Sequence, residues 1–509
     1  MKNAHRAAWI AVCALLMLAV LVRWQFIFSF ISDGDDAVFA LMARHISQAR
    51  EFPLYVWQAH YSGTLSLYLV AALFRFAGPH AWAYNVTGVF LSLCWAVLTL
   101  LLARRWLGRS GYCAAFALTA VAPLQVLTRS LILCGWAETL LLGTVMCIVL
   151  SRWMQQPAQR HSGSYALLGL ICGIGQWISP GYTFLTLTAL TVVIFTDRRR
   201  FVRQGGIWFI LGALAGYLPA LVYALQHPGA SAMRMAGRIL DLDRSVLAAA
   251  HPGLTVLRQL VWRLSTVPAS LLRIPSLIRQ LMGPINAAVF GVALTALCLK
   301  EVPLFLKERK ITAGMVVIIA AVWFVLVYVF LVGEAAARYM HPSYMIFALC
   351  AGWAISVLWQ RWKAVSLFLL LLLITANMYS IAYPSRTVDA SAWKELVAWL
   401  ESRGFDRGYS DYWAGYPVVF ASREKVIISP TLFHPDNSDR YPDYTRQVRS
   451  AQAVFLLVDT RLYPRAKQQI EERLQALKIA FGFFQIRRFA LFYDFSQPVT
   501  PQLLQLKGR

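Results

Sequence analysis

Long apolar runs separated by short basic segments fill the first 383 residues of the chain, and this pattern ends after Tyr383. Runs of about 15–25 apolar residues cross, or nearly cross, a hydrocarbon layer of roughly 30 Å. The pattern therefore predicts a polytopic α-helical membrane protein with about eleven transmembrane helices. The predicted spans are residues 7–29, 82–103, 112–128, 131–150, 165–179, 182–196, 206–225, 286–299, 312–332, 343–359 and 364–383.

Residues 384–509 have a different pattern, in which short apolar runs alternate with polar stretches at both helical and strand spacing. We expect a transmembrane domain at 1–383 followed by a small C-terminal α/β domain at 384–509. In this domain the predicted helices are 391–403 and 466–480, and the predicted strands are 426–428, 453–458 and 483–495.

Composition and charge agree with a membrane protein, because 59% of the residues are hydrophobic and only 14% are charged, against roughly 25% charged in soluble proteins. This excludes a soluble cytosolic enzyme. The formal net charge of +24 would suggest a nucleic-acid partner in a soluble protein. Here, however, basic residues recur in every second connecting segment, which predicts a cytoplasmic N-terminus, an outer C-terminal domain and no nucleic acid. These residues are Arg104, Arg105, Arg109, Arg152, Arg160, Arg198, Arg199, Arg200, Arg203, Lys300, Lys307, Arg309, Lys310, Arg361 and Lys363.

Three longer segments fall on the predicted outer side: loop 31–81, loop 226–285 and the C-terminal domain. Loop 226–285 carries seven arginines against two aspartates. It is either an amphipathic segment on the membrane surface or a basic surface that faces lipid phosphates.

An acidic cluster follows the first predicted span, where Asp33, Asp35 and Asp36 lie within five residues. The whole chain has only 24 acidic residues, and carboxylates this close repel one another. The cluster therefore favours either a bound divalent cation, Mg²⁺ or Mn²⁺, or a carboxylate whose pKa is raised toward use as a base. The alternative is that Asp35 or Asp36 caps a helix over residues 37–48.

Around and beyond this cluster the sequence resembles the GT-C membrane glycosyltransferases, most nearly family 39, which includes the protein O-mannosyltransferases and the lipid A aminoarabinose transferase. The acidic pair Asp35-Asp36 stands where the first outer loop of that family begins with Asp-Glu or Asp-Asp. Later segments are similar to the family in the same order: Gly135-Trp-Ala-Glu138, Trp177-Ile-Ser-Pro180, Arg338-Tyr-Met-His-Pro342, Tyr412-Trp413 and Arg440-Tyr-Pro442. The sequence departs from better-known members at Tyr61-Ser62-Gly63, where they have Lys-Pro-Pro or His-Pro-Pro.

The resemblance implies an inverting enzyme of a bacterial inner membrane that moves a sugar from a polyprenyl-phosphate donor to an acceptor hydroxyl on a glycan, lipid or protein, with its C-terminal domain in the periplasm. Asp35 would be the general base, and Asp36 would orient it or hold a metal. The supporting or metal-binding candidates are Asp33 and Glu138, the donor-phosphate candidates are Arg338, Arg129 and His60, and the acceptor candidates are Tyr412, Trp413, Arg440 and Tyr441.

Some roles have alternatives in the sequence. Glu138, inside predicted span 131–150, is a second site acid or the buried partner of Arg129. Arg338 can pair with Glu334, one helical turn away, and His341 is more typical of a helix start than of a ligand. The C-terminal aromatic residues can equally pack the domain onto the membrane part.

Two other protein classes fit the hydrophobic pattern. A transporter or flippase for envelope glycolipids would favour inverted repeats and charges near the bilayer midplane. The sequence shows no repeat. An O-antigen polymerase-like protein would also have a large outer loop, but the early Asp-Asp loop and the motif order favour the GT-C interpretation.

Overall fold

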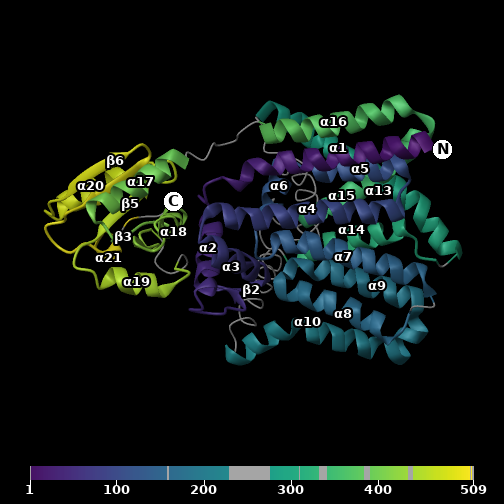
Figure 1. Ribbon diagram of the computed structural model, residues 1–509, viewed down its shortest axis with the longest axis horizontal. Helices are drawn as coiled ribbons and strands as arrows, with labels where there is room; N and C mark the ends of the chain where they lie inside the picture. The colour runs from purple at the N-terminus through teal and green to yellow at the C-terminus, as the bar shows by residue number, and fades with distance from the viewer. Residues whose placement is uncertain are drawn as a thin grey trace, which may run out of the picture. The chain divides into compact units, whose positions relative to one another are not determined.

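The apolar runs of the sequence form long helices in the computed structural model, which is drawn in Figure 1. The structure describes residues 2–157, 160–227, 276–308, 310–331, 341–382, 390–433, 439–504 and 506. The chain divides into two compact units. The helical unit comprises residues 1–26, 60–65 and 86–385, and the α/β unit comprises residues 27–59, 66–85 and 386–509.

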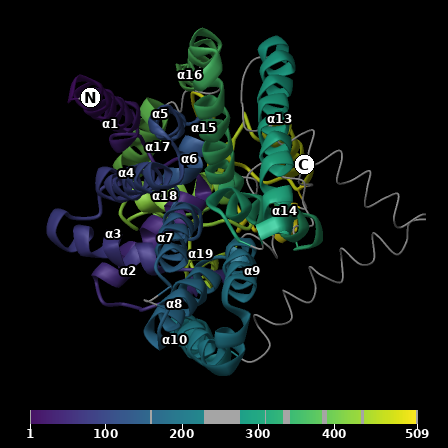
Figure 2. The same ribbon diagram turned by 90° about the vertical axis from the view of Figure 1, so that its right-hand side faces the viewer.

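Helices that run side by side build the helical unit (Figures 1 and 2). They are α1 (Lys2–Ile27), α4 (Ala81–Trp106), α5 (Arg109–Ala120), α6 (Leu124–Leu131), α7 (Trp136–Gln155), α8 (Ser162–Ile178), α9 (Thr183–Arg200), α10 (Gly206–Gln226), α13 (Ser276–Glu308), α14 (Ala313–Leu331), α15 (Tyr344–Arg361) and α16 (Lys363–Ala382), with short helical turns at Pro180–Tyr182 and Phe201–Gly205. The first residues of α4 and the last residue of α1 fall in the α/β unit.

By length and composition, six helices of the described chain can cross a membrane, or up to eight if each bent pair is one span. The predicted span 112–128 is such a pair, because α5 and α6 meet at 72°. The segment Pro180–Gln226 is counted as one of the six helices, although its 47 residues correspond to roughly 70 Å of helix. Within this segment Asp197 has non-helical dihedral angles. A polytopic helical membrane protein is therefore confirmed, whereas eleven spans stays a prediction.

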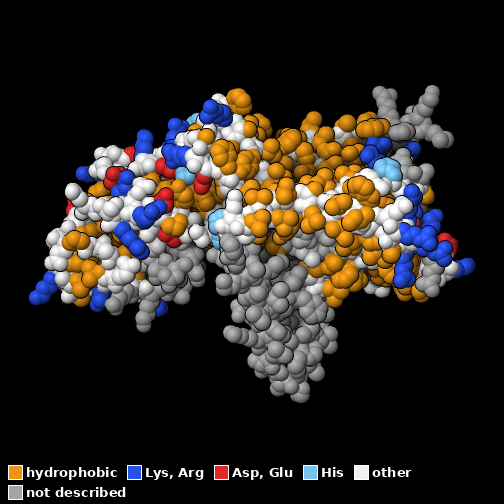
Figure 3. Space-filling view, turned by 90° about the horizontal axis from the view of Figure 1, so that it is seen from below, with side chains coloured by type: hydrophobic (Ala, Val, Ile, Leu, Met, Phe, Trp, Pro, Cys, Tyr) orange, Lys and Arg blue, Asp and Glu red, His pale blue; other side chains and the backbone are white. Residues whose placement is uncertain are grey.

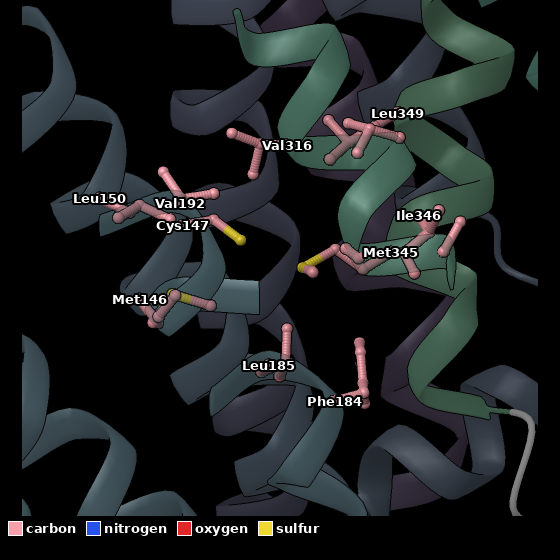
Figure 4. Packing of buried hydrophobic residues seen from close by; sticks show 14 of the residues in the cluster. Met146, Cys147, Leu150, Phe184, Leu185, Val192, Val316, Met345, Ile346 and Leu349 are labelled. Atoms are coloured by element: carbon pink, nitrogen blue, oxygen red, sulfur yellow. The ribbon is translucent and has the colours of Figure 1, made fainter. Parts of the chain in front are cut away.

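The interior of the helical unit is apolar and closely packed. Figure 4 shows side chains of α7, α9, α14 and α15 that point toward one another, among them Met146, Leu185, Val316 and Met345. Figure 3 shows the outside of these helices covered by apolar side chains, with Lys and Arg gathered at one end. An apolar band with a basic end is typical of helices in a bilayer.

Close contact between α8 and α10 explains the Gly-rich part of the sequence. A Cβ atom on Gly169 would lie 2.0 Å from the carbonyl oxygen of Phe209, and one on Gly173 would lie 2.1 Å from that of Ala213. Small residues let membrane helices approach to backbone distance. These glycines therefore serve helix packing.

The α/β unit joins residues 27–59 and 66–85 to the C-terminal segment, residues 386–509. Its loop elements include α2 (Gly34–Ser47), β1 (Tyr55–Val56) and most of α3 (Leu65–Ala77); β2 (Ala59–Gly63) begins in this unit. Its C-terminal elements are α17 (Ala390–Arg403), β3 (Arg407–Tyr409), α18 (Tyr412–Ala421), β4 (Ile427–Ser429), α19 (Pro442–Arg449), β5 (Phe455–Asp459), α20 (Ala466–Ala476), β6 (Gly482–Ile486), β7 (Phe489–Tyr493) and α21 (Pro501–Leu504).

The C-terminal strands form a five-stranded sheet in the order β4-β3-β5-β7-β6. Strands β4, β3 and β5 are parallel, while β7 is antiparallel to both β5 and β6. The chain leaves strand β3 for its neighbour β4 on one side and then crosses to β5, its neighbour on the other side. Ligand crevices of open α/β sheets form where the connections diverge in this way, at the carboxyl ends of the strands.

Candidate functional site

The acidic cluster forms the beginning of α2. Asp33 has extended dihedral angles and caps the helix, because its carboxylate accepts a hydrogen bond of 3.0 Å from the backbone N–H of Asp35. The alternative of a cap at Asp35 or Asp36 was wrong, since the helix begins at Gly34 and not at Ala37. Asp35 and Asp36 therefore lie in the first turn, where the helix dipole stabilises a carboxylate.

Tyr412 from the C-terminal segment contacts the acidic cluster directly. Its hydroxyl donates a hydrogen bond of 2.5 Å to Oδ1 of Asp35. Gly34 lies against the same ring, and a Cβ atom there would be 2.6 Å from Cε1 of Tyr412. Burial and the nearby Asp35 raise the pKa of Tyr412 well above its usual value of 10.0. The hydroxyl therefore stays protonated at neutral pH and remains a donor.

Asp36 has a tyrosine partner of its own. The hydroxyl of Tyr84 donates a hydrogen bond of 2.7 Å to Oδ1 of Asp36. Both Asp35 and Asp36 are partly exposed. The two carboxylates are thus oriented by tyrosines from different segments while still accessible to solvent.

The other acceptor candidates lie in the segments that follow the parallel strands β3 and β4. The guanidinium of Arg440 lies 5.7 Å from the ring centre of Tyr412 and donates to the carbonyl of Gln58 at 3.2 Å. Tyr441 stacks on Trp57 with ring centres 4.3 Å apart. Trp413 follows Tyr412 in α18 and is 41% exposed. The structure places Tyr412 beside both Asp35 and Arg440.

A charged network at the other end of α2 was missed by the sequence reasoning. His45 is buried, and its ring nitrogens lie 3.0 Å from Glu51 and 2.9 Å from Glu424. Glu424 also pairs with Arg44 at 3.2 Å and accepts from the hydroxyl of Tyr444 at 2.9 Å. Glu424 follows α18, 379 residues after His45, so no local pattern in the sequence could have revealed the pair.

The electrostatics of this network favour the charged forms of His45 and Glu424. Burial alone would raise the pKa of Glu424, but the hydrogen bond to His45 and its other partners outweigh burial and lower it to about 2. Burial alone would lower the pKa of His45, but the hydrogen bonds to Glu424 and Glu51 raise it above 6.5. The result is a buried ion pair that joins α2 to the C-terminal segment.

Glu138 lies at the start of a helix and not deep within it. The sequence placed it well inside span 131–150, but α7 begins only at Trp136, after Cys134 and Gly135 adopt positive φ angles of 58° and 111°. The carboxylate is buried and accepts the backbone N–H groups of Cys134 at 3.1 Å and Gly135 at 3.0 Å. These bonds stabilise the helix start as a capping box does.

Two donor-phosphate candidates have contacts in the helical unit. The guanidinium of Arg129 lies 5.5 Å from the ring centre of Trp136 and makes no ion pair with any described residue. His60 is hydrogen-bonded to the hydroxyl of Tyr223 in α10. Arg338 and its alternative partner Glu334 lie outside the described residues.

His341 begins the helical segment His341–Arg361, as expected of a helix-start residue. It is buried, and within the described chain neither ring nitrogen has a hydrogen-bond partner. Its ring meets that of Trp136 edge to face, with centres 5.3 Å apart. The ring of Trp136 therefore contacts both Arg129 and His341.

The predicted divalent metal has no ready site in the part of the chain that is described. No group of three or more His, Cys, Asp or Glu side chains is placed to hold an ion there. Asp33 accepts from a backbone N–H, while Asp35 and Asp36 accept from tyrosine hydroxyls. These carboxylates do not form a metal site by themselves.

Comparison with known proteins identifies solved structures of similar fold. No protein-family model and no curated protein matches the sequence. Among solved structures, the chain is similar to the Archaeoglobus fulgidus oligosaccharyltransferase in complex with Zn and sulfate, with 13% identity and a TM-score of 0.54 over 95% of this chain and 72% of that one. The same archaeal enzyme, AglB, in complex with an inhibitory peptide and a dolichol-phosphate gives 12% and 0.53 over 98% and 75%.

ArnT from Cupriavidus metallidurans bound to undecaprenyl phosphate matches with 11% identity and a TM-score of 0.51, over 95% of this chain and 97% of that one. Both enzymes are GT-C membrane glycosyltransferases. The resemblance drawn from the sequence motifs is therefore confirmed at the level of the fold.

Proposed function

We propose that this chain is a polyprenyl-phosphate-dependent glycosyltransferase, which transfers a sugar with inversion to an acceptor hydroxyl on the outer face of a bacterial inner membrane. The observation that carries the proposal is Asp35, a partly exposed carboxylate in the first turn of α2 that Tyr412 orients. The GT-C fold supports it, since the solved neighbours bind dolichol-phosphate or undecaprenyl phosphate.

Asp35 would act as the general base. As the acceptor oxygen forms a bond to the anomeric carbon, its proton passes to Asp35 and the bond from that carbon to the lipid phosphate breaks. Attack opposite the leaving group inverts the anomeric carbon.

The departing lipid phosphate needs positive charge or hydrogen-bond donors as its own charge develops. Arg129 suits this role because it has no carboxylate partner among the described residues, and His341 beside Trp136 is a buried donor without a partner. We assign donor-phosphate binding to Arg129 and His341, and retain His60 and Arg338 as further candidates.

The acceptor would be held by side chains of the α/β unit. Exposed Trp413 offers a face for stacking on a sugar ring, and the Arg440 guanidinium offers hydrogen-bond donors to hydroxyl or acidic groups. Tyr441 extends this surface from the loop before α19. Tyr412 uses its hydroxyl on Asp35 and so contributes only its ring.

Asp35→Asn tests the assignment of the base. The purified full chain is mixed with membranes from a strain that lacks its gene, which supply donor and acceptor, and mass spectrometry follows the mass added to envelope glycans and glycolipids. Asn keeps the shape of the side chain but cannot take the proton, so we expect transfer to fall at least about 100-fold.

The matched control is Asp33→Asn, because Asn caps a helix as well as Asp does, and transfer should stay within a few-fold of wild type. Full transfer by the Asp35→Asn chain would refute Asp35 as the base. No added mass with wild-type protein would refute the transferase and favour a transporter or polymerase.

A further inference from the structure

We propose that Tyr412 is a positioning residue for Asp35, so that the C-terminal segment supplies part of the catalytic centre. This inference rests on the proposed function. It begins from the hydrogen bond of 2.5 Å between the Tyr412 hydroxyl and Oδ1 of Asp35. Within the described chain, no other side chain donates to Asp35, so this bond alone sets the rotation of the carboxylate.

The position of Tyr412 is itself determined by the sheet. Strand β3 ends at Tyr409, and Asp411 caps α18 by accepting the N–H groups of Trp413 at 2.7 Å and Ala414 at 3.2 Å. Asp411 is only 1% exposed. Tyr412 is thus the first residue of a helix whose start is held at the carboxyl end of a buried strand.

The ring of Tyr412 is also fixed from its sides. Gly34 of α2 approaches it so closely that any larger residue would collide with Cε1 and Cδ1. Arg440, from the loop after β4, places its guanidinium 5.7 Å from the ring centre. Loops after two neighbouring parallel strands therefore converge on the residue that holds Asp35, at the point where α/β sheets place their ligand crevices.

In this geometry the two carboxylate oxygens of Asp35 have different roles. Oδ1 is engaged by the hydroxyl, which keeps its own proton because burial holds that proton in place. Oδ2 is left to receive the acceptor's proton. A base held within a narrow range of angles is effective because misplacement by about 1 Å costs up to about 100-fold in rate.

Tyr412→Phe tests the inference in the same membrane assay, with the rate measured at increasing amounts of membrane. We expect the maximal rate to fall about 10- to 100-fold, while the membrane concentration at half-maximal rate changes less than about 2-fold, because substrate binding is untouched. In the Asp35→Asn background the same substitution should cause no further loss, since Tyr412 acts only through Asp35.

Tyr444→Phe is the matched control. Tyr444 is another buried tyrosine that donates to a carboxylate in this unit, that of Glu424 at 2.9 Å. Its substitution should lower the unfolding temperature at least as much as Tyr412→Phe does and leave the maximal rate within about 2-fold. Should Tyr412→Phe fail to fold, 4-fluorophenylalanine at 412 keeps the ring and fills the place of the hydroxyl without donating a hydrogen bond, and the same fall in maximal rate is expected.

The outcomes separate the two proposals. Wild-type transfer that Asp35→Asn abolishes and Tyr412→Phe leaves intact overturns the positioning role and keeps the proposed function. An equal loss from Tyr412→Phe in the wild-type and Asp35→Asn backgrounds also overturns it, because the tyrosine would then act independently. No transfer by wild-type protein overturns both.

Discussion

Three neighbouring aspartates take three different partners at the start of α2. Asp33 accepts from a backbone N–H, Asp35 from Tyr412 and Asp36 from Tyr84. The proposed base, Asp35, is the one of the three that a side chain of the C-terminal segment orients. The sequence locates the acidic cluster but does not show which partner each aspartate has, because Tyr84 and Tyr412 lie 48 and 377 residues away from Asp36 and Asp35.

Gly34 allows the contact between α2 and Tyr412, and Gly34→Ala should disrupt it. The new methyl group would lie 2.6 Å from Cε1 of the tyrosine and 2.9 Å from its carbonyl oxygen, so the ring must move. Overpacking of this kind costs about 1–3 kcal/mol of unfolding free energy. Thermal unfolding and the transfer assay should both show the loss.

Gly291→Ala in α13 is the control, since nothing lies within 4 Å of a Cβ atom there and alanine favours a helix. It should be neutral or slightly stabilising. Equal stability of the Gly34→Ala and Gly291→Ala chains would contradict the close contact at Tyr412.

At the scale of elements, the C-terminal segment holds α2 at both ends. Tyr412 contacts its first turn, Glu424 contacts His45 in its last turn, and α2 packs against α18 between them. A helix held at both ends keeps the direction of its first turn, where Asp35 lies.

The ion pair at the end of α2 should make stability depend on pH. The raised pKa of His45 means that its contribution is present below about pH 6.5 and is lost as the pH rises through the higher folded value. The lowered pKa of Glu424 means that its contribution is present above about pH 4.5 and is lost as the pH falls toward 2. Groups facing the imidazole and Glu424 include Glu51, Arg44, Arg50 and Tyr444.

The unfolding temperature of the α/β unit should therefore be higher at pH 6 than at pH 9. In His45→Gln this difference should shrink, because the glutamine has no charge to lose. Glu424→Gln should cost about 3 kcal/mol at pH 6, since it removes the carboxylate that His45 and Arg44 share. An unchanged difference between pH 6 and pH 9 in His45→Gln would exclude His45 as its source.

Some elements could be predicted from the sequence and others could not. The helix predicted at 391–403 is α17, and the strands predicted at 426–428 and 453–458 match β4 and β5 within two residues. Strand β3 has only three residues and no alternation to detect, and α18 contains Gly415 and Pro417, which weaken any helical pattern. The sequence pattern therefore did not predict β3 and α18, and Tyr412 is the first residue of α18.

At the scale of the whole molecule, the pattern of basic residues predicts a direction across the membrane. Lys and Arg gather at one end of the apolar helices (Figure 3). Reporter domains fused after Arg200 and at the C-terminus should therefore report opposite sides, with the first cytoplasmic. Alkaline phosphatase and a fluorescent protein serve as the two reporters, because each gives its signal on the side of the membrane where the other does not. The same side for both fusions would contradict the predicted topology.

The α/β unit is assembled from segments that are far apart in the chain, since residues 27–59 and 66–85 join residues 386–509. Ribosomes add roughly 5–20 residues per second. Residues 27–85 are therefore synthesised on the order of 15–60 s before the C-terminal segment that begins at residue 386. During that interval α2 lacks Tyr412 and Glu424, and its apolar face is exposed to chaperones and proteases. Completion of the proposed catalytic centre is thus a late event in synthesis, and a chain interrupted before residue 386 would leave this face of α2 uncovered.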